Sequence, residues 1–216
     1  MATYVLIHGA GDVGWYWHLV EADLRQRGHD VVAMDLPSDD DSAGLSEYAD
    51  TVIDAIGDRT DLVVVAQSFG GFTAPLVCDR LQVDLLVMLA AMIPSPGERP
   101  DDWWKQTGYE SSDEYEDEYA LFFNGVPPDL AAEAMKRGRD QSGTPMEKPW
   151  PLKAWPDVPT KFLLCRDDRF FPPEFMRRVA HDRLGITPDE IDGGHCIALS
   201  RPKELAERLD AYRAEL

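Results

Sequence analysis

Short apolar runs alternate along the chain with longer segments whose apolar residues recur at helical spacing. The apolar runs are strand candidates at Tyr4–His8, Asp30–Asp35, Leu62–Gln67, Leu85–Ala91, Lys161–Arg166 and Ile186–Ile191. The segments between them have helical character, and the C-terminal one places Leu205, Leu209 and Tyr212 on one face. Strands that alternate with helices form parallel sheets covered on both faces. We therefore predict an α/β fold with a doubly wound, mostly parallel six-stranded sheet.

Residues 94–156 interrupt this alternation. The stretch is rich in proline, contains an acidic run at 110–118, and holds four of the six tryptophans: Trp103, Trp104, Trp150 and Trp155. It follows the carboxyl end of a predicted strand, where a long insertion can cover a site. We predict a core of residues 1–93 and 157–216 and a helical cap, or lid, of residues 94–156. An irregular surface excursion with its own small core is the alternative.

Composition narrows the classes of partner. The 216 residues fit one domain, and 44% hydrophobic residues are enough for a core. A net charge of −19 argues against nucleic acid and anionic membranes as partners. Three cysteines without a CxxC pair indicate neither a disulfide framework nor a zinc site. With no signal peptide and no long apolar run, we expect a cytoplasmic protein without a metal; the sequence leaves the oligomeric state open.

The N-terminal stretch "YVLIHGAGDVGWYW" allows two interpretations. Gly9, Gly11 and Gly14 follow a strand as GxGxxG, and Asp35 ends the next strand, as in a dinucleotide-binding fold. The same loop, read from His8, can instead expose a backbone N–H to an oxyanion. Trp15 and its aromatic neighbours would crowd a pyrophosphate, which disfavours the dinucleotide and leads us to expect no cofactor.

A second turn carries a candidate nucleophile. In "VVVAQSFGG" a buried strand runs directly into Ser68, with Ala66 and Gly70 at the two flanking positions that must be small. Such a turn directs a serine hydroxyl out of the sheet, and the following helix begins with free N–H groups. An ordinary strand–helix junction is the alternative interpretation.

The partners that a serine nucleophile needs follow in chain order. A serine requires a base, and the base requires an orienting acid. Asp167 and Asp168 follow the strand after the insertion, and His195 lies in a glycine-containing loop after the last predicted strand. Asp168 as a helix cap and His195 as a simple loop residue are the alternatives, but the order serine, acid, histidine at successive strand ends favours a triad.

Together, "VLIHGAG", "GHDVVAMDLP", "VVVAQSFGG", "CRDDRFFPP" and "GGHCIALSRP" resemble the α/β-hydrolase superfamily over essentially the full length. The chain is most similar to the short plant-type branch of methyl esterases and hydroxynitrile lyases. The resemblance implies an α/β-hydrolase fold with Ser68, Asp168 and His195 as the triad. It places Asp168, rather than Asp167, at the acid position, and implies oxyanion donors at the N–H groups of Ala10 and Phe69.

The site residues favour ester hydrolysis. Gly9 and Cys196 stand where the similar lyases carry threonine and lysine, so the two side chains that assist the lyase reaction are missing here. We predict a serine carboxylesterase that cleaves small apolar or aromatic esters through an acyl-enzyme. Trp15, Trp103 and Trp104 are the candidate substrate-binding residues. The alternatives are an NAD(P)-binding oxidoreductase that uses Gly9, Gly11 and Gly14, and a weakly catalytic homologue that binds a small molecule.

Overall fold

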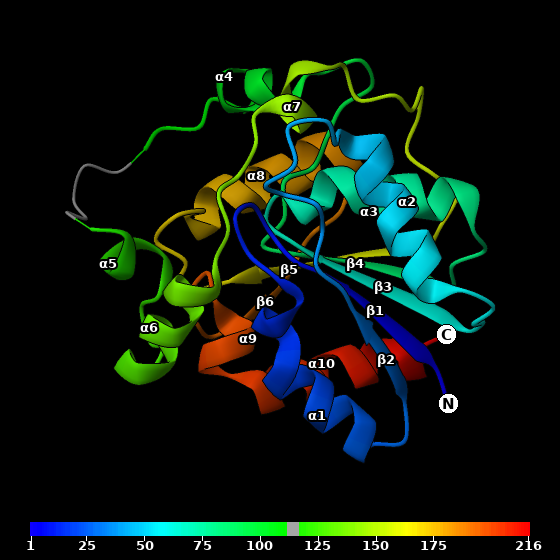
Figure 1. Cartoon of the computed structure of the whole chain (residues 1–216), viewed down its shortest axis with the longest axis vertical. Coiled ribbons are helices and arrows are strands. Elements are labelled where there is room, and N and C mark those ends of the chain that lie inside the picture. The colour runs from blue at the N-terminus through cyan, green and yellow to red at the C-terminus, as the bar shows by residue number, and fades with distance from the viewer. Residues whose placement is uncertain (112–116) are drawn as a thin grey trace.

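The computed structural model describes residues 1–111 and 117–216. Its sheet has six strands, all parallel, in the order β2-β1-β3-β4-β5-β6 (Figure 1). The strands are β1 (Thr3–Ile7), β2 (Asp30–Ala33), β3 (Leu62–Gln67), β4 (Leu85–Leu89), β5 (Thr160–Cys165) and β6 (Asp189–Ile191). The predicted doubly wound α/β sheet is confirmed. β6 is shorter than predicted because Pro188, which has no N–H to give to a strand ladder, precedes it.

Helices cover both faces of the sheet (Figure 1). On one face lie α2 (Leu45–Ile56), α3 (Gly70–Arg80) and α8 (Pro173–Leu184). On the other lie α1 (His18–Gln26), which follows the short 3-10 turn η1 (Gly14–Trp17), and α9 (Ile197–Ser200) and α10 (Pro202–Ala214). The four inner strands, β1, β3, β4 and β5, each contribute to two hydrophobic cores, because alternate side chains point to opposite faces. In β1, Val5 and Ile7 join the core beneath α2 and α3, whereas Tyr4 and Leu6 join the core beneath α1 and α10.

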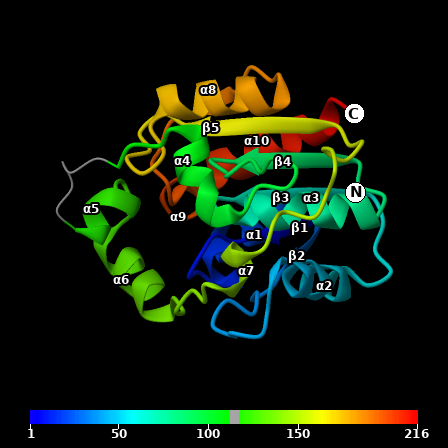
Figure 2. The same cartoon turned by 90° about the horizontal axis from the view of Figure 1, so that it is seen from above.

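The chain between β4 and β5 is here called the β4–β5 segment, and its described residues form five short helical elements. They are η2 (Pro100–Asp102), α4 (Trp103–Thr107), α5 (Glu118–Phe122), α6 (Pro128–Arg137) and α7 (Thr144–Glu147). α5 and α6 lie beyond the carboxyl ends of the strands in both views (Figure 2). Of the acidic run noted in the sequence, Asp113, Glu114 and Glu116 lie outside the described residues.

Both ends of the β4–β5 segment are anchored in the hydrophobic core beneath α2, α3 and α8, here called the main core. The indole of Trp103 donates to the carbonyl oxygen of Ile93 at 2.9 Å, and that of Trp150 to the carbonyl oxygen of Phe72 at 3.0 Å. Glu98 is buried and forms a two-bond ion pair with Arg183 of α8, one bond being 2.7 Å long. The Trp150 and Glu98 contacts join the two ends of the segment to α3 and α8, whereas the Trp103 bond links two parts of the segment itself.

Candidate active site

Ser68 occupies a strained turn between β3 and α3. Its φ of +52° lies in the left-handed region, which residues other than glycine seldom adopt. The turn also brings two backbones into close approach. A Cβ at Gly70 would lie 2.8 Å from the carbonyl oxygen of His8, and one at Gly71 would lie 2.0 Å from that of Met92. Only glycine fits at either position, and the resulting turn holds Ser68 beyond the carboxyl end of β3.

The glycine-containing loop after β1 lies directly against Ser68. A Cβ at Gly9 would lie 2.9 Å from Ser68 Cβ and 2.6 Å from Gln67 Oε1, so any larger residue at position 9 would collide with the turn. Ala10 follows in the same loop, and Phe69 follows Ser68; both line the pocket that contains Ser68. The two residues predicted to supply oxyanion donors therefore share one pocket with the serine, one from each loop.

The side chain of His8 holds the loop after β1 in place through two hydrogen bonds. Its Nε2 accepts the N–H of Leu36 at 3.0 Å, so the ring proton lies on Nδ1, which donates to the carbonyl oxygen of Gly9 at 2.8 Å. Burial lowers the pKa of His8 to about 4. The ring is therefore neutral near pH 7, and its two hydrogen bonds join the loop after β1 to the end of β2.

Asp168 and His195 form a buried pair beside the serine. His195 Nδ1 and Asp168 Oδ2 are 2.8 Å apart, and the two residues are 4% exposed. The other carboxylate oxygen of Asp168 accepts the N–H groups of Phe170 and Phe171, both at 2.9 Å. With the carboxylate as acceptor, Nδ1 carries the proton and Nε2 is left as the basic nitrogen. His195 and Ser68 line the same pocket.

Aromatic rings surround the histidine. The ring centroids of Phe170, Phe171 and Phe122 lie 5.2, 5.4 and 5.7 Å from that of His195, all at steep angles. These rings restrict the rotation of the imidazole and exclude water from it. The sequence analysis did not identify them; the signal was the pair of phenylalanines directly after the acid, in "RDDRFFPP".

The pocket beside Ser68 has a volume of about 430 Å³. Its apolar lining includes Met92, Met146, Phe122, Phe123 and Trp104. This volume suits a ligand of drug-like size or smaller.

Of the three tryptophans predicted to bind substrate, the structure places only Trp104 in the lining of this pocket. Trp103 is fully buried in the main core. Trp15 stacks on His18, with ring centroids 4.2 Å apart, and lies beneath the guanidinium of Arg137. The neighbouring residues Trp103 and Trp104 point differently because successive side chains on a helix are about 100° apart.

Acidic groups outnumber unpaired basic groups around this pocket. Asp12, Glu118 and Asp140 line it, whereas the lining residue Arg139 forms an ion pair with Asp35 at 2.8 Å. Burial raises the pKa of Asp12 to about 7, although the N–H of Val13 and the nearby His195 oppose this shift. The pocket thus combines an apolar wall with an acidic edge.

The β4–β5 segment also holds the glycine-containing loop. The N–H of Arg139 donates to the carbonyl oxygen of Gly11 at 2.8 Å, and the N–H of Gly11 donates to Gln141 Oε1 at 3.1 Å. Asp35, the acid of the dinucleotide interpretation, accepts the N–H of Gly14 at 2.8 Å in addition to its ion pair with Arg139. Contacts within the protein therefore occupy the groups that a dinucleotide would need.

A parallel α/β sheet with a serine in a strained turn, a buried acid–histidine pair and an open pocket at the strand ends defines a serine hydrolase-like fold and site. A family model described as "Alpha/beta hydrolase family" matches residues 4–208. The chain belongs to this family, and the resemblance found in the sequence is confirmed.

Curated relatives of the chain carry esterase and synthase names. "Probable esterase PIR7A" from Oryza sativa subsp. indica is 27% identical over 250 aligned positions, covering 95% of this chain and 94% of the relative. "Methylesterase 7" from Arabidopsis thaliana is 30% identical over 110 positions, covering 45% of this chain and 42% of the relative. "Norfluorocurarine synthase 1" from Strychnos nux-vomica is 23% identical, covering 95% and 93%.

Solved structures share the fold. Polyneuridine aldehyde esterase superposes with a TM-score of 0.84 at 19% identity, covering 98% of this chain and 99% of that one. The Arabidopsis methylesterase MES16 superposes with a TM-score of 0.81 at 17% identity, covering 100% of both chains. Within residues 1–111 and 117–216, no helix is both long and apolar enough to cross a membrane.

Proposed function

We propose that the protein is a serine carboxylesterase that hydrolyses small apolar or aromatic esters. The observation that carries the proposal is the convergence of Ser68, in its strained turn, with the buried Asp168–His195 pair at one pocket. The esterase names of the curated relatives support the same reaction class.

The proposed catalytic cycle uses these residues in sequence. Ser68 Oγ attacks the ester carbonyl carbon while His195 Nε2 takes its proton, and the Ala10 and Phe69 N–H groups stabilise the oxyanion. His195 returns the proton to the leaving alcohol, leaving an acyl group on Ser68. A water molecule, deprotonated by the same nitrogen, then releases the carboxylic acid. Asp168 holds the imidazole in the required tautomer throughout.

The pocket supports the choice of substrate class. Trp104 and the methionine and phenylalanine side chains offer an apolar surface to an alkyl or aromatic group. The carboxylates of Glu118 and Asp140 at the edge of the pocket disfavour an anionic substrate, and Asp12 joins them as the pH rises above about 7. We assign substrate contact to Trp104 and not to Trp15 or Trp103, which lie outside the pocket lining.

Two alternatives are less well supported. Lyase chemistry of the similar plant enzymes needs a side chain where this chain has Gly9, and a residue there would collide with Gln67 and Ser68. A dinucleotide would compete with the internal hydrogen bonds of Gly14 and Asp35.

We also propose that part of the β4–β5 segment, within residues 94–156, serves as the lid of the pocket. We propose further that the protein is cytoplasmic.

The test combines labelling with turnover. A serine-directed fluorophosphonate should add one label, on the peptide that contains Ser68, and should abolish hydrolysis of 4-nitrophenyl acetate. Ser68→Ala should prevent labelling and reduce kcat by several orders of magnitude, because the nucleophile is lost. Turnover that persists in Ser68→Ala, or a label on another serine, would contradict the proposal. A label without measurable turnover of any nitrophenyl ester would favour the small-molecule-binding alternative.

A further inference from the structure

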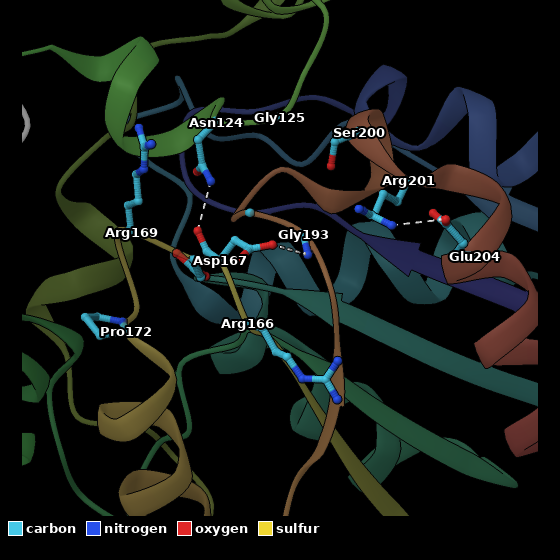
Figure 3. Close-up of a pocket in the computed structure, with 12 residues that line it drawn as sticks. Asn124, Gly125, Arg166, Asp167, Arg169, Pro172, Gly193, Ser200, Arg201 and Glu204 are labelled. Atoms are coloured by element: carbon cyan, nitrogen blue, oxygen red, sulfur yellow. Dashed lines mark hydrogen bonds and ion pairs between the residues drawn. The ribbon is translucent and has the colours of Figure 1, made fainter.

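The turn after α5, which contains Asn124, packs against two loops. One follows β5 and carries Asp168 (the acid loop), and the other follows β6 and carries His195 (the histidine loop). Asn124 Nδ2 donates to the carbonyl oxygen of Asp167 at 2.9 Å (Figure 3). Asp167 is in turn bonded twice to Gly193: its N–H donates to the Gly193 carbonyl oxygen, and its Oδ2 accepts the Gly193 N–H, both at 3.0 Å. The side chain of Asn124 thus reaches the residue before the acid, and through it the histidine loop.

The same turn also touches the histidine loop directly. The N–H of Cys196, next to His195, donates to the carbonyl oxygen of Phe122 at 3.3 Å. A Cβ at Gly194 would lie 2.5 Å from Asn124 Oδ1 and 2.7 Å from the Asn124 carbonyl oxygen. The turn and the loop are therefore in contact at a position where only glycine fits.

A third contact lies on the other side of the acid. Arg169 Nη1 donates to the carbonyl oxygen of Ala120 at 2.7 Å. Residues 120–124 consequently hold the residue before Asp168, the residue after it, and the residue after His195. These contacts lie beside a second cavity of about 840 Å³, between the turn, the acid loop and the start of α10 (Figure 3).

We propose that Asn124 is a positioning residue for the Asp168–His195 pair, acting through its hydrogen bond to the Asp167 carbonyl group and its contact with Gly194. The inference rests on the proposed esterase function for its kinetic consequence. The bond matters because base and nucleophile must be held within a fraction of an ångström of the productive geometry. It also joins the β4–β5 segment to the loop that carries Asp168.

The side chain chemistry of Asn124 fits this role. A carbonyl oxygen requires a donor, and the amide supplies one without introducing charge beside the Asp168 carboxylate. Among the described residues, its Oδ1 is buried and has no hydrogen-bond partner. The polar stabilisation of this side chain therefore comes from the Nδ2 bond.

The test uses Asn124→Leu, which keeps a side chain of similar size and removes the amide, and Asn124→Ala as a second variant that creates no new contact. The control is Lys136→Gln, an exposed change on α6. With 4-nitrophenyl acetate, both Asn124 variants should lower kcat about tenfold and change KM less than twofold. The apparent pKa on the acidic limb of the kcat profile should fall, because a loosened Asp168 stabilises the protonated imidazole less. The control should match the wild type in all three.

A measurement that does not depend on turnover separates this proposal from the proposed function. The Nδ1–H proton of His195, bonded to Asp168, should give a far-downfield NMR signal in the wild type and exchange faster with solvent in both Asn124 variants. That change in a protein without esterase activity would support positioning while the proposed function fails. If the wild type is an active esterase but the folded variants keep its kcat, pH profile and proton exchange rate, Asn124 does not position the pair.

Discussion

At the scale of single residues, two neighbouring carboxylates at the end of β5 have different surroundings. Asp168 is buried and accepts two backbone N–H groups as well as the bond from His195. Asp167 instead lines the second cavity, outside the Ser68 pocket, and bonds to Gly193 (Figure 3). One carboxylate therefore contacts the imidazole, while the other fixes the backbone of the loop that carries it.

This difference predicts a ranking of two isosteric variants. Asp168→Asn should lower kcat by orders of magnitude, because an amide in this place favours the wrong tautomer; the effect is about 10⁴-fold in the best-studied triad. Asp167→Asn should cost no more than about tenfold, since the amide oxygen still accepts the Gly193 N–H. Steady-state kinetics with 4-nitrophenyl acetate measure both, and the reverse ranking would assign the acid to Asp167.

Asp12, which lines the pocket, makes the free energy of unfolding depend on pH. Its pKa is raised to about 7 by burial, so the folded protein keeps the proton at pH values where the unfolded chain has lost it. The free energy of unfolding therefore falls, through this group, as the pH rises from about 4 to about 7. Asp12→Asn removes the buried charge while its amide oxygen can still accept the Val13 N–H.

We expect Asp12→Asn to raise Tm at pH 8 by several degrees and to change it little at pH 4.5, since about 1 kcal/mol shifts Tm by about 2–4 °C in a chain of this size. Thermal unfolding at the two pH values tests this expectation. An equal gain at both values would mean that the carboxyl group is not held in its neutral form by the fold.

At the scale of elements, α4 shows how one short helix serves two purposes. Trp103 anchors it in the main core through the bond to Ile93, while Trp104 contributes to the pocket wall. Burial of an indole in a core stabilises the fold, whereas an indole at a pocket changes which ligands fit.

Trp104→Ala should therefore change selectivity more than stability. We expect KM for 4-nitrophenyl esters of aromatic or longer acids to rise about tenfold, while kcat/KM for the acetate stays within threefold. Trp103→Ala should instead destabilise the protein by about 3–5 kcal/mol, as deletions of large buried side chains do. Loss of acetate activity in a stable Trp104→Ala variant would show that α4 takes part in the chemistry itself.

The elements also show what the sequence could reveal. The strands were predictable because a sheet buried on both faces requires nearly continuous apolar runs. The convergence of Ser68, His195 and an acid at Asp167 or Asp168 was predictable because parallel strands bring their carboxyl ends to one edge, whereas the choice of Asp168 came from the family resemblance. The different roles of Trp103 and Trp104 were not predictable, since only tertiary packing distinguishes two adjacent tryptophans. The bonds of Arg139 to Gly11 and Asn124 to Asp167 join distant segments that share no pattern.

At the scale of the whole molecule, the net charge of −19 acts on every approaching solute. Forty acidic residues against 21 lysines and arginines give a negative potential, and the acidic edge of the pocket lies within it. Negative solutes are repelled, and salt screens the repulsion: the Debye length falls from about 30 Å at 0.01 M to about 3 Å at 1 M.

A matched pair of substrates measures this field. The two substrates are 4-nitrophenyl butyrate and the monoanionic 4-nitrophenyl succinate, which carries a carboxylate at the end of its acyl chain. At 10 mM salt, kcat/KM should be about tenfold lower for the succinate than for the butyrate. The gap should narrow severalfold at 1 M KCl, because salt screens the anion but leaves a neutral ester unaffected by charge. The ratio of the two kcat/KM values cancels general effects of salt on the enzyme. A ratio that does not change with salt would mean that the acyl pocket discriminates by shape alone, and a preference for the succinate would place an unpaired basic group within its reach.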